Sequence, residues 1–310
     1  MRAAPRTLAN PFEFALTFPL LSGTGWTGDA AFASESELVD FDTAAFFSQF
    51  LVQMQQLQCT DGTVGSCIPN TDPHRDGQPA PLPCVKAEAD PSWGTVYPTI
   101  AWGVWKYYGA TGVAARNYPS LKLYVDMLET AINASGSLAK IFCTYGDWNP
   151  VVHTDCHITA AASYLHDLMH MAEVAAALGE TADAAAYSAR LAARRAEYHA
   201  SFYNATTGVY GAGTQVAQAV ALWTGVAAGA GVASSVSASL AQDMVSQGLT
   251  TGFIGVRYAY EALALNGHIE AALRTLLRTS YPSYGEQSRT RPRNRVRACV
   301  CSEVSNSPAP

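Results

Sequence analysis

Apolar residues between positions 37 and about 280 recur at the spacing of helix faces. Leu165, Leu168 and Ala172, for example, fall on one side of a helix with 3.6 residues per turn. No alternation of apolar and polar residues extends beyond four or five positions, so no strand of ordinary length is predicted. The spacing predicts helices at 41–58, 95–109, 117–132, 157–179, 181–203, 214–228, 232–247, 253–266 and 268–279. We therefore expect an all-α fold.

The links between the predicted helices are of two kinds. Short links such as 178-LGET-181 join neighbouring helices into antiparallel pairs. Longer links carry many Gly, Asp and Trp residues, and they cover 22–36, 59–94, 140–156, 204–213 and 280–287. This distribution favours a ring of helical hairpins with short turns at one end and a functional site among the long loops at the other.

Composition divides the chain into three regions and limits its partners. We expect a divergent N-terminal segment at 1–22, a helical domain at 23–287 and a disordered tail at 288–310, where five Arg stand against one Glu. The net charge of the whole chain is −6, so the residues outside this Arg-rich tail are mildly acidic. This charge argues against nucleic acid as a partner. No apolar run reaches the roughly 18 residues that a membrane span needs. Neutral small molecules remain open as ligands.

The cysteines suggest an oxidising compartment. Seven are present, and two pairs flank short loops, Cys59 with Cys67 and Cys143 with Cys156, so two loop-closing disulfides are plausible. Glycosylation sequons begin at Asn133 and Asn204. Together these features favour a secreted or organellar protein. The alternative is that the sequons arise by chance and that the thiols are simply buried.

Three tryptophans stand in glycine-rich links: Trp26 in 22-SGTGWTGDA-30, Trp93 in 90-DPSWGTVYP-98 and Trp148 in 145-YGDWNP-150. Carboxylates are close by, since Asp29 follows Trp26 and Asp147 precedes Trp148. An indole offers a flat apolar wall and a carboxylate accepts hydrogen bonds from hydroxyl groups. A pyranose, with its C–H faces and hydroxyl rim, needs both, so these links predict a carbohydrate site. The alternative is that each indole only fills the core.

Two histidine patterns resemble metal sites, but other interpretations suit them better. His166 and His170 are spaced as a zinc pair on a helix, yet their neighbours are apolar and no third ligand is evident. The run 153-HTDCH-157 also reads as a helix start with Asp155 as its N-cap. We therefore expect no metal and no cofactor. Motifs for nucleotide binding or for a serine-hydrolase elbow are also missing.

Eight motifs in order resemble the catalytic domain of bacterial and fungal α-L-rhamnosidases, glycoside hydrolase family 78. They extend from about residue 23 to 287 and read GWTGDA, DGTVGSCIPN, DPSWGTVYPTIAWGVWKYYG, YPSLKLYVDML, YGDWNP, TQVAQAVALW, LTTGFIGVRYAYEAL and TSYPSYG. The resemblance implies an (α/α)6 barrel of six helical hairpins that hydrolyses terminal α-L-rhamnosides with inversion. It also implies a rhamnose subsite lined by Trp26 and Asp29, with Trp93 and Trp148 as aromatic walls and Asp147 as a polar partner.

This sequence departs from the resemblance at both ends. An inverting glycosidase needs a carboxylic acid and a carboxylate base. The position implied for the acid, seven residues before Asp29, is Ser22, and a serine hydroxyl is not acidic at neutral pH. The base is implied just beyond 281-YPSYG-285, where Glu286 comes too early and Glu303 lies in a different context. Nine predicted helices instead of twelve also indicate an incomplete barrel with uncovered apolar faces and marginal solubility.

Three hypotheses follow from the sequence. The chain is a rhamnosidase whose ends are altered or which is a fragment, or it is a rhamnoside-binding pseudoenzyme that keeps the sugar subsite without the chemistry. The third is a structural helical protein without a carbohydrate role, which predicts that Trp26, Trp93 and Trp148 lie far apart in the core.

Overall fold

The computed structural model describes residues 24–70 and 89–286, and this part of the chain is mostly helical. The ten longer helices are α2 (Thr27–Asp40), α3 (Ala44–Leu57), α5 (Val96–Tyr108), α6 (Thr111–Ser135), α7 (Cys156–Leu178), α8 (Thr181–Phe202), α9 (Gln215–Trp223), α11 (Ala233–Gln247), α12 (Phe253–Leu265) and α13 (Ile269–Leu276). Single turns form α4 (Pro91–Gly94), α10 (Val226–Gly229) and the 3-10 turn η1 (Leu138–Lys140). The expected all-α class is confirmed.

Four short strands complete the described residues. β1 (Thr24–Trp26) pairs antiparallel with β2 (Cys67–Asn70), and β3 (Tyr203–Asn204) pairs antiparallel with β4 (Val209–Tyr210). In the first pair Trp26 lies opposite Cys67. None of the described helices is both long enough and apolar enough to cross a membrane.

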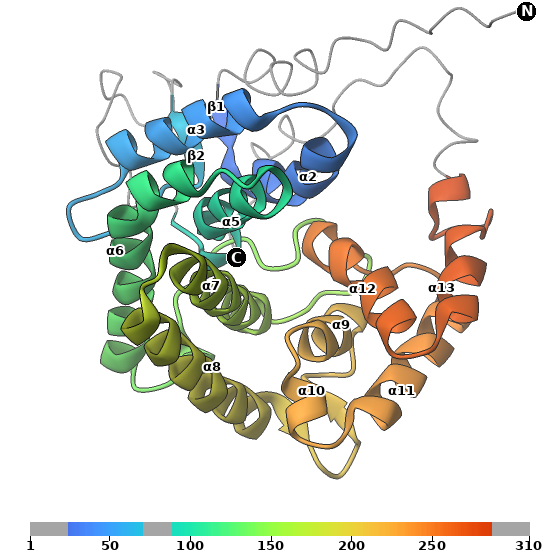
Figure 1. The fold of residues 1–310 in the computed structure, drawn as a ribbon. Coiled ribbons are helices and arrows are strands. Elements are labelled where there is room, and N and C mark those ends of the chain that lie inside the picture. Colours follow the sequence, from blue (N-terminus) through green and yellow to red (C-terminus); the bar gives the residue numbers. More distant parts are fainter. Residues whose placement is uncertain (1–23, 71–88, 287–310) are drawn as a thin grey trace, which may run out of the picture.

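The helices form five hairpins arranged in a ring within the described residues, namely α2–α3, α5–α6, α7–α8, α9–α11 and α12–α13 (Figure 1). The first helix of each hairpin lies inside and the second outside. Burial shows this division, because α7 buries fifteen of its 23 residues whereas α8 buries three of 22. Neighbouring inner helices contact one another in the order α2, α5, α7, α9, α12. The described hairpins thus have the arrangement of the helical barrel that the sequence implied. Five of the six implied hairpins lie within the described residues.

The inner ring closes between its first and last helices. The Arg257 guanidinium on α12 donates to the carbonyl of Ala31 at 3.0 Å and pairs with Glu35 at 3.3 Å, both on α2. The rings of Phe32 and Phe253 meet edge to face with centroids 4.8 Å apart. In the outer layer of the described residues, α13 packs against α11 and α12.

Local sequence explains the best-predicted boundaries. At the start of α7 the Asp155 carboxylate accepts the backbone N–H of His157 at 3.0 Å, which is an N-cap. At its end Gly179 takes φ 79°, the left-handed C-cap conformation that glycine favours. The helix therefore spans 156–178, within one residue at each end of the predicted 157–179.

Several predicted elements differ from the structure. Helix α2 occupies part of the expected loop 22–36. The pattern did not predict it because, apart from Leu38, its buried residues are small or polar: Thr27, Gly28, Ala31 and Ser34. The packing of α2 on α5, rather than an apolar period in its sequence, stabilises this helix. The predicted helix 214–228 breaks into α9 and α10 at Gly225, where φ is 76°. Helix α6 begins at Thr111, six residues before the predicted start at 117. It continues through Pro119.

One predicted disulfide is confirmed and the other is wrong. Cys143 and Cys156 are bonded, with Cα atoms 5.8 Å apart. Cys59 is also disulfide-bonded, but not to Cys67, which keeps a buried thiol. Flanking a short loop in the sequence was therefore not enough to pair these two cysteines, and Cys67 lies instead in β2, opposite Trp26 of β1.

The two predicted terminal segments, 1–22 and 288–310, lie outside the described residues. So does Ser22, at the implied acid position. The boundaries of the central domain therefore stay a prediction.

We predict that replacing both Cys143 and Cys156 by serine lowers the free energy of unfolding by about 3 kcal/mol. The reason is that the disulfide joins two residues 13 positions apart in the chain and so restricts the unfolded state. Denaturant unfolding monitored by circular dichroism measures this. Cys67→Ala is the control, since it removes a buried sulfur without breaking a disulfide. It should lower the free energy of unfolding by less. Equal losses in the two variants would show that cross-linking is not the cause.

Candidate functional site

The three predicted tryptophans converge on one aromatic side chain, Tyr145. Its ring centroid lies 4.5 Å from that of Trp93, 5.8 Å from that of Trp148 and 5.9 Å from that of Trp26. Trp26 ends β1, Trp93 belongs to α4, and Trp148 lies on the loop before α7, so three separate links meet here. We call these four residues the aromatic cluster. Its formation contradicts the expectation, from the structural-protein hypothesis, that the indoles lie far apart.

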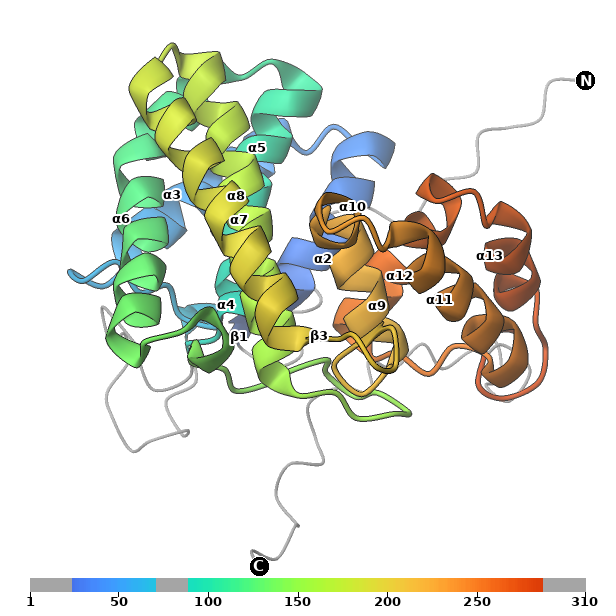
Figure 2. The same cartoon turned by 90° about the horizontal axis from the view of Figure 1, so that it is seen from below.

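All five inner helices begin at the end of the ring that carries this cluster. Trp26 is the residue before α2, and Trp93 lies just before α5. The hydroxyl groups of Thr154 and Thr214, which precede α7 and α9, are 2.7 Å apart. Figure 2 shows β1 and α4 at the same end of the helices as the loop between α6 and α7. Helix N-termini attract polar and anionic groups, which makes this end suited to ligand binding.

The indoles differ in exposure. Trp93 is buried, with 3% of its surface exposed, whereas Trp26 and Trp148 are half-buried. Trp93 thus forms the floor of the cluster, and the other two reach the surface. A ligand would contact Trp26 and Trp148 first.

The glycine in GWTGDA permits the cluster to form. Gly28 lies in the first turn of α2, and a Cβ added there would sit 2.5 Å from Cε2 of Trp93. Any larger residue would therefore push the indole away. The permissive backbone of this stretch serves close packing between α2 and Trp93.

Asp29 is also in the first turn of α2 and is half-buried. Burial raises the pKa of its carboxyl to about 6, and a hydrogen bond from its own backbone N–H opposes the shift. A carboxyl with a perturbed pKa, three residues from Trp26 of the aromatic cluster, is a candidate functional group.

Asp147 has a different setting, because backbone donors occupy both of its oxygens. They accept the N–H groups of Gly252 at 2.7 Å and Gly255 at 2.8 Å, at the start of α12. Burial raises the pKa of Asp147, and these hydrogen bonds oppose the rise. The N–H of Phe253 also donates to the carbonyl of Trp148 at 2.8 Å. Asp147 therefore fastens the loop to α12, and its direct binding of sugar stays a prediction.

Asp90 fastens the other side of the same loop. One oxygen caps α4 by accepting the N–H of Ser92 at 2.7 Å. The other accepts the N–H groups of Thr144 at 2.6 Å and Tyr145 at 2.9 Å. Sequence reasoning missed both Asp90 and Tyr145 as site residues. Their signal was present, because each stands in a motif that carries one of the tryptophans.

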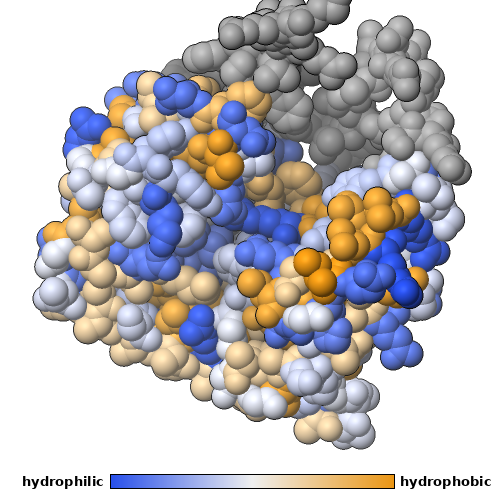
Figure 3. Space-filling view, turned by 45° about the vertical axis from the view of Figure 1, so that its right-hand side comes forward, coloured by the Kyte–Doolittle hydropathy of each residue, from blue (hydrophilic) through white to orange (hydrophobic). Residues whose placement is uncertain are grey.

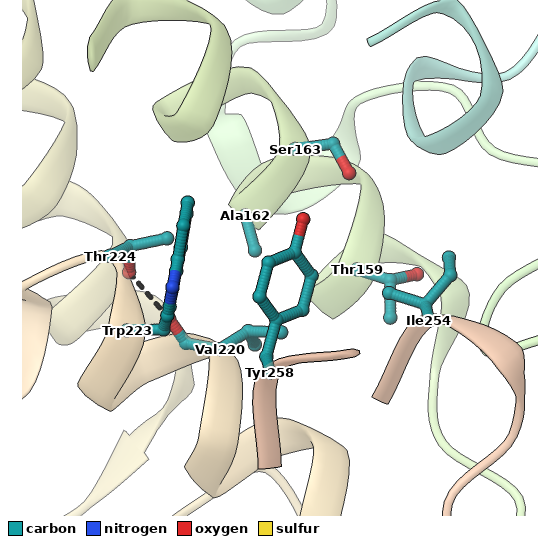
Figure 4. A pocket seen from close by; sticks show the side chains of 8 residues that line it. All are labelled: Thr159, Ala162, Ser163, Val220, Trp223, Thr224, Ile254 and Tyr258. Carbon is teal, nitrogen blue, oxygen red and sulfur yellow. Dashed lines mark hydrogen bonds between the residues drawn. The ribbon is translucent and has the colours of Figure 1, made fainter. Parts of the chain in front are cut away.

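A hollow of about 390 Å³ adjoins the cluster. Its lining comes from the stretch that the disulfide closes and consists of Thr144, Tyr145, Gly146, Asp147, Pro150, His153, Thr154, Asp155 and Cys156. A second crevice lies between α7, α9 and α12, where the rings of Trp223 and Tyr258 stand 4.7 Å apart (Figure 4). This crevice is too narrow to hold a water molecule, so the hollow beside Tyr145 is the better ligand space.

The histidine patterns have structural surroundings. His166 and His170 are buried with ring centroids 4.0 Å apart, and His170 stacks on Trp102. Burial holds the pKa of both histidines well below the ordinary value, so both rings are neutral. In the described part of the chain, the grouping nearest to a metal-ligand set is Cys143, Cys156 and His157, but its two sulfur atoms already form the disulfide.

A ring of α-helical hairpins with an aromatic site at the N-terminal ends of its inner helices defines a helical-barrel domain. Residues 23–290 match the model of the bacterial α-L-rhamnosidase six-hairpin glycosidase domain, and the chain belongs to this family.

Curated relatives include α-L-rhamnosidases from Streptomyces avermitilis, 26% identical over 268 residues, and from Alteromonas sp. strain LOR, 24% identical over 276 residues. Each alignment covers 84% of this chain, which spans only 24% and 28% of the two relatives. Among solved structures, the α-L-rhamnosidase from Dictyoglumus thermophilum has a TM-score of 0.74 at 24% identity, over 86% of this chain and 30% of its own. The S. avermitilis enzyme complexed with L-rhamnose has a TM-score of 0.73 at 24% identity, over 86% and 24%.

We predict that Gly28→Ala displaces Trp93 and lowers the free energy of unfolding by about 1–3 kcal/mol through overpacking. Tryptophan fluorescence and near-ultraviolet circular dichroism report the displacement. Gly112→Ala is the matched control, because it also lies in a helix, α6, but an added Cβ meets nothing within 4 Å. An unchanged aromatic spectrum in Gly28→Ala would contradict the packing argument.

We predict that Asp29→Asn stabilises the fold at pH 7 and has little effect near pH 4. The folded pKa of about 6 lies above the ordinary aspartate pKa of 3.8, so the folded state loses stability as the pH rises from 3.8 to about 6. Removing the charge relieves this cost, by about 1–2 kcal/mol after allowance for partial exposure. Thermal unfolding across this pH range measures it, with exposed Asp42→Asn as the control. A variant that gains no stability at pH 7 would refute the prediction.

Proposed function

We propose that this domain recognises the terminal α-L-rhamnose of rhamnosides at the aromatic cluster. The convergence of Trp26, Trp93 and Trp148 on Tyr145 is the observation that carries the proposal. Stacked aromatic rings bind the C–H face of a sugar, and the methyl group of a 6-deoxy sugar adds apolar surface. The family to which the chain belongs supports rhamnose over other sugars.

The side chains take distinct roles in this proposal. Trp26 and Trp148 contact the sugar, since both reach the surface, and Trp93 supports them from below. Asp29 accepts hydrogen bonds from hydroxyl groups of the sugar, for which its ionised form above pH 6 is the better acceptor. Asp147 and Asp90 hold the loop that presents Tyr145 and Trp148.

The proposal does not extend to hydrolysis by these residues. The curated relatives are α-L-rhamnosidases, and inversion requires a carboxylic acid and a carboxylate base. This sequence has Ser22 at the implied acid position, and loss of one member of such a pair costs about 10²- to 10⁴-fold in rate. We therefore propose rhamnoside binding with little or no turnover by these 310 residues alone.

We predict that L-rhamnose binds the chain and quenches or shifts its tryptophan emission. L-Mannose, which differs only by a hydroxyl on C6, should bind about 3- to 10-fold more weakly, because the methyl contact with indole is worth about 1 kcal/mol. Isothermal titration calorimetry measures both affinities. Trp148→Ala should abolish binding, and Trp105→Ala is the matched control, a half-buried indole on α5 outside the cluster.

Two further results would decide the proposal. Absence of L-rhamnose binding, or binding indifferent to Trp148→Ala, would overturn it. Release of nitrophenol from nitrophenyl α-L-rhamnoside at an ordinary enzymatic rate would replace the binding function by hydrolysis, and the dependence of that rate on Asp29 would then identify the group involved.

A further inference from the structure

Two glycosylation sequons in this sequence have no part in the proposed recognition of rhamnose. They begin at Asn133 and Asn204. An N-linked glycan is bulky and hydrophilic, so its acceptor must lie on the surface with a free amide nitrogen. The structure places the first sequon in the last turn of α6 and the second on the turn between β3 and β4. The local surroundings of the two asparagines therefore decide which one suits a glycan.

The β3–β4 hairpin exposes the whole of its sequon. Asn204 ends β3 and lies opposite Val209 in the register. The N–H of Gly208 donates to the carbonyl of Asn204 at 2.8 Å and closes the turn. Residues 204–207 are all exposed. The three positions that a glycosylating enzyme reads are thus open to solvent on one short turn.

Hydrogen bonds hold the Asn204 carboxamide by its oxygen and leave its nitrogen free. Oδ1 accepts the backbone N–H groups of Thr206 at 2.9 Å and Thr207 at 3.2 Å, which is an Asx-turn. Within the described residues, neither Nδ2 of Asn204 nor the hydroxyl of Thr206 has a hydrogen-bond partner. Nδ2 is the atom to which a glycan is attached, and the hydroxyl defines the third position of the sequon. Both groups are therefore available to an enzyme.

Aromatic packing fixes the root of this hairpin. The Tyr210 side chain is fully buried, and its hydroxyl lies 2.9 Å from Nδ1 of His199. The ring of Tyr203 stacks on that of His199 with centroids 4.6 Å apart. Residues 204–207, beyond these rings, are small or polar. A glycan on the tip of the hairpin would therefore leave its packed root unchanged.

Asn133 is less suited to carry a glycan. Its Oδ1 accepts a hydrogen bond from the Arg194 guanidinium at 2.8 Å, and the same guanidinium pairs with Glu129 at 2.8 Å. The hydroxyl of Ser135, the third position of this sequon, donates to the carbonyl of Ile132 at 2.9 Å. The backbone of 133–135 is also helical. A glycan at Asn133 would therefore disturb an ion pair and the end of a helix.

The surface of α13 has a different character from the tip of the β3–β4 hairpin. Ile269, Leu273 and Leu277 are exposed, and Figure 3 shows apolar side chains gathered on the face that carries α12 and α13. An exposed apolar surface is typical of a contact with another surface, which a glycan would obstruct. Residues 204–207 include no large apolar side chain. A hydrophilic glycan is therefore compatible with this part of the surface.

The disulfides agree with the compartment in which N-linked glycans are added. Cys143 and Cys156 form one disulfide, and Cys59 belongs to another. Disulfides persist in oxidising compartments such as the lumen of the secretory pathway, where N-linked glycans are also attached. The bonded cysteines and the exposed sequon therefore favour the same compartment.

We propose that Asn204 carries an N-linked glycan and that Asn133 does not. The donor is a lipid-linked oligosaccharide whose first sugar is joined to a diphosphate. Nδ2 of Asn204 forms a bond to the anomeric carbon of that sugar, the bond from this carbon to the diphosphate oxygen breaks, and the diphosphate leaves on its lipid. One amide proton passes to a base of the transferring enzyme. This modification is independent of rhamnose recognition.

The glycan is attached at the same end of the ring as the aromatic cluster. Figure 2 shows β3 at the end that also carries β1 and α4. None of residues 203–210 lines the hollow beside Tyr145. The attachment point therefore lies at this end of the ring but outside the hollow.

The test expresses the full chain of 310 residues through the secretory pathway of a eukaryotic cell. Peptide-N-glycosidase removes N-linked glycans and converts each modified Asn to Asp, so mass spectrometry of peptides gives the occupancy of both sequons. We expect Asn204 to be modified in most molecules and Asn133 in few. An unmodified Asn204, or equal occupancy of the two sequons, would overturn the proposal.

Thr206→Ala and Thr207→Ala form a matched pair of variants. Both threonines are exposed and donate their backbone N–H groups to the same oxygen of Asn204, but only Thr206 belongs to the sequon. Thr206→Ala should lose the glycan, whereas Thr207→Ala and Thr206→Ser should keep it. Circular dichroism establishes that each secreted variant is folded. Retention of the glycan in Thr206→Ala, or its loss in Thr207→Ala, would contradict attachment at Asn204.

Discussion

The hydrogen bonds from the start of α12 to the buried carboxylate of Asp147 are the contact on which the rest of the site depends. They join positions 105 and 108 residues apart in the chain. The first N–H groups of a helix have no partner within it, and here a carboxylate from a distant loop satisfies two of them. Because the same loop carries Tyr145 and Trp148, the start of an inner helix sets the position of two aromatic walls.

A second anion and a covalent bond complete this arrangement. Asp90 holds the N–H groups of Thr144 and Tyr145, and the Cys143–Cys156 disulfide closes the loop around them. The cluster is thus held from its backbone side and not by contacts among the indoles. Trp148 can therefore stay half-exposed, and so remain open to a ligand, without losing its position.

Two features lower the stability of the fold: a buried carboxyl group and an exposed apolar helix face. Asp29 keeps a carboxyl where burial raises its pKa to about 6, which is a cost that a purely structural residue would not need. The inner ring closes through Arg257 on Ala31 and Glu35, whereas the outer layer ends at the apolar face of α13.

The sequence by itself determined the helical class, the boundaries of elements such as α7, the Cys143–Cys156 bond and the family resemblance. Periodicity and capping residues report the burial of each helix face, which is local information. Helix α2, the anchoring roles of Asp90 and Asp147, the central place of Tyr145 and the thiol of Cys67 came only from the tertiary structure. Each depends on contacts between segments that the ring brings together from far along the chain, and no local pattern records which distant N–H group a carboxylate will meet.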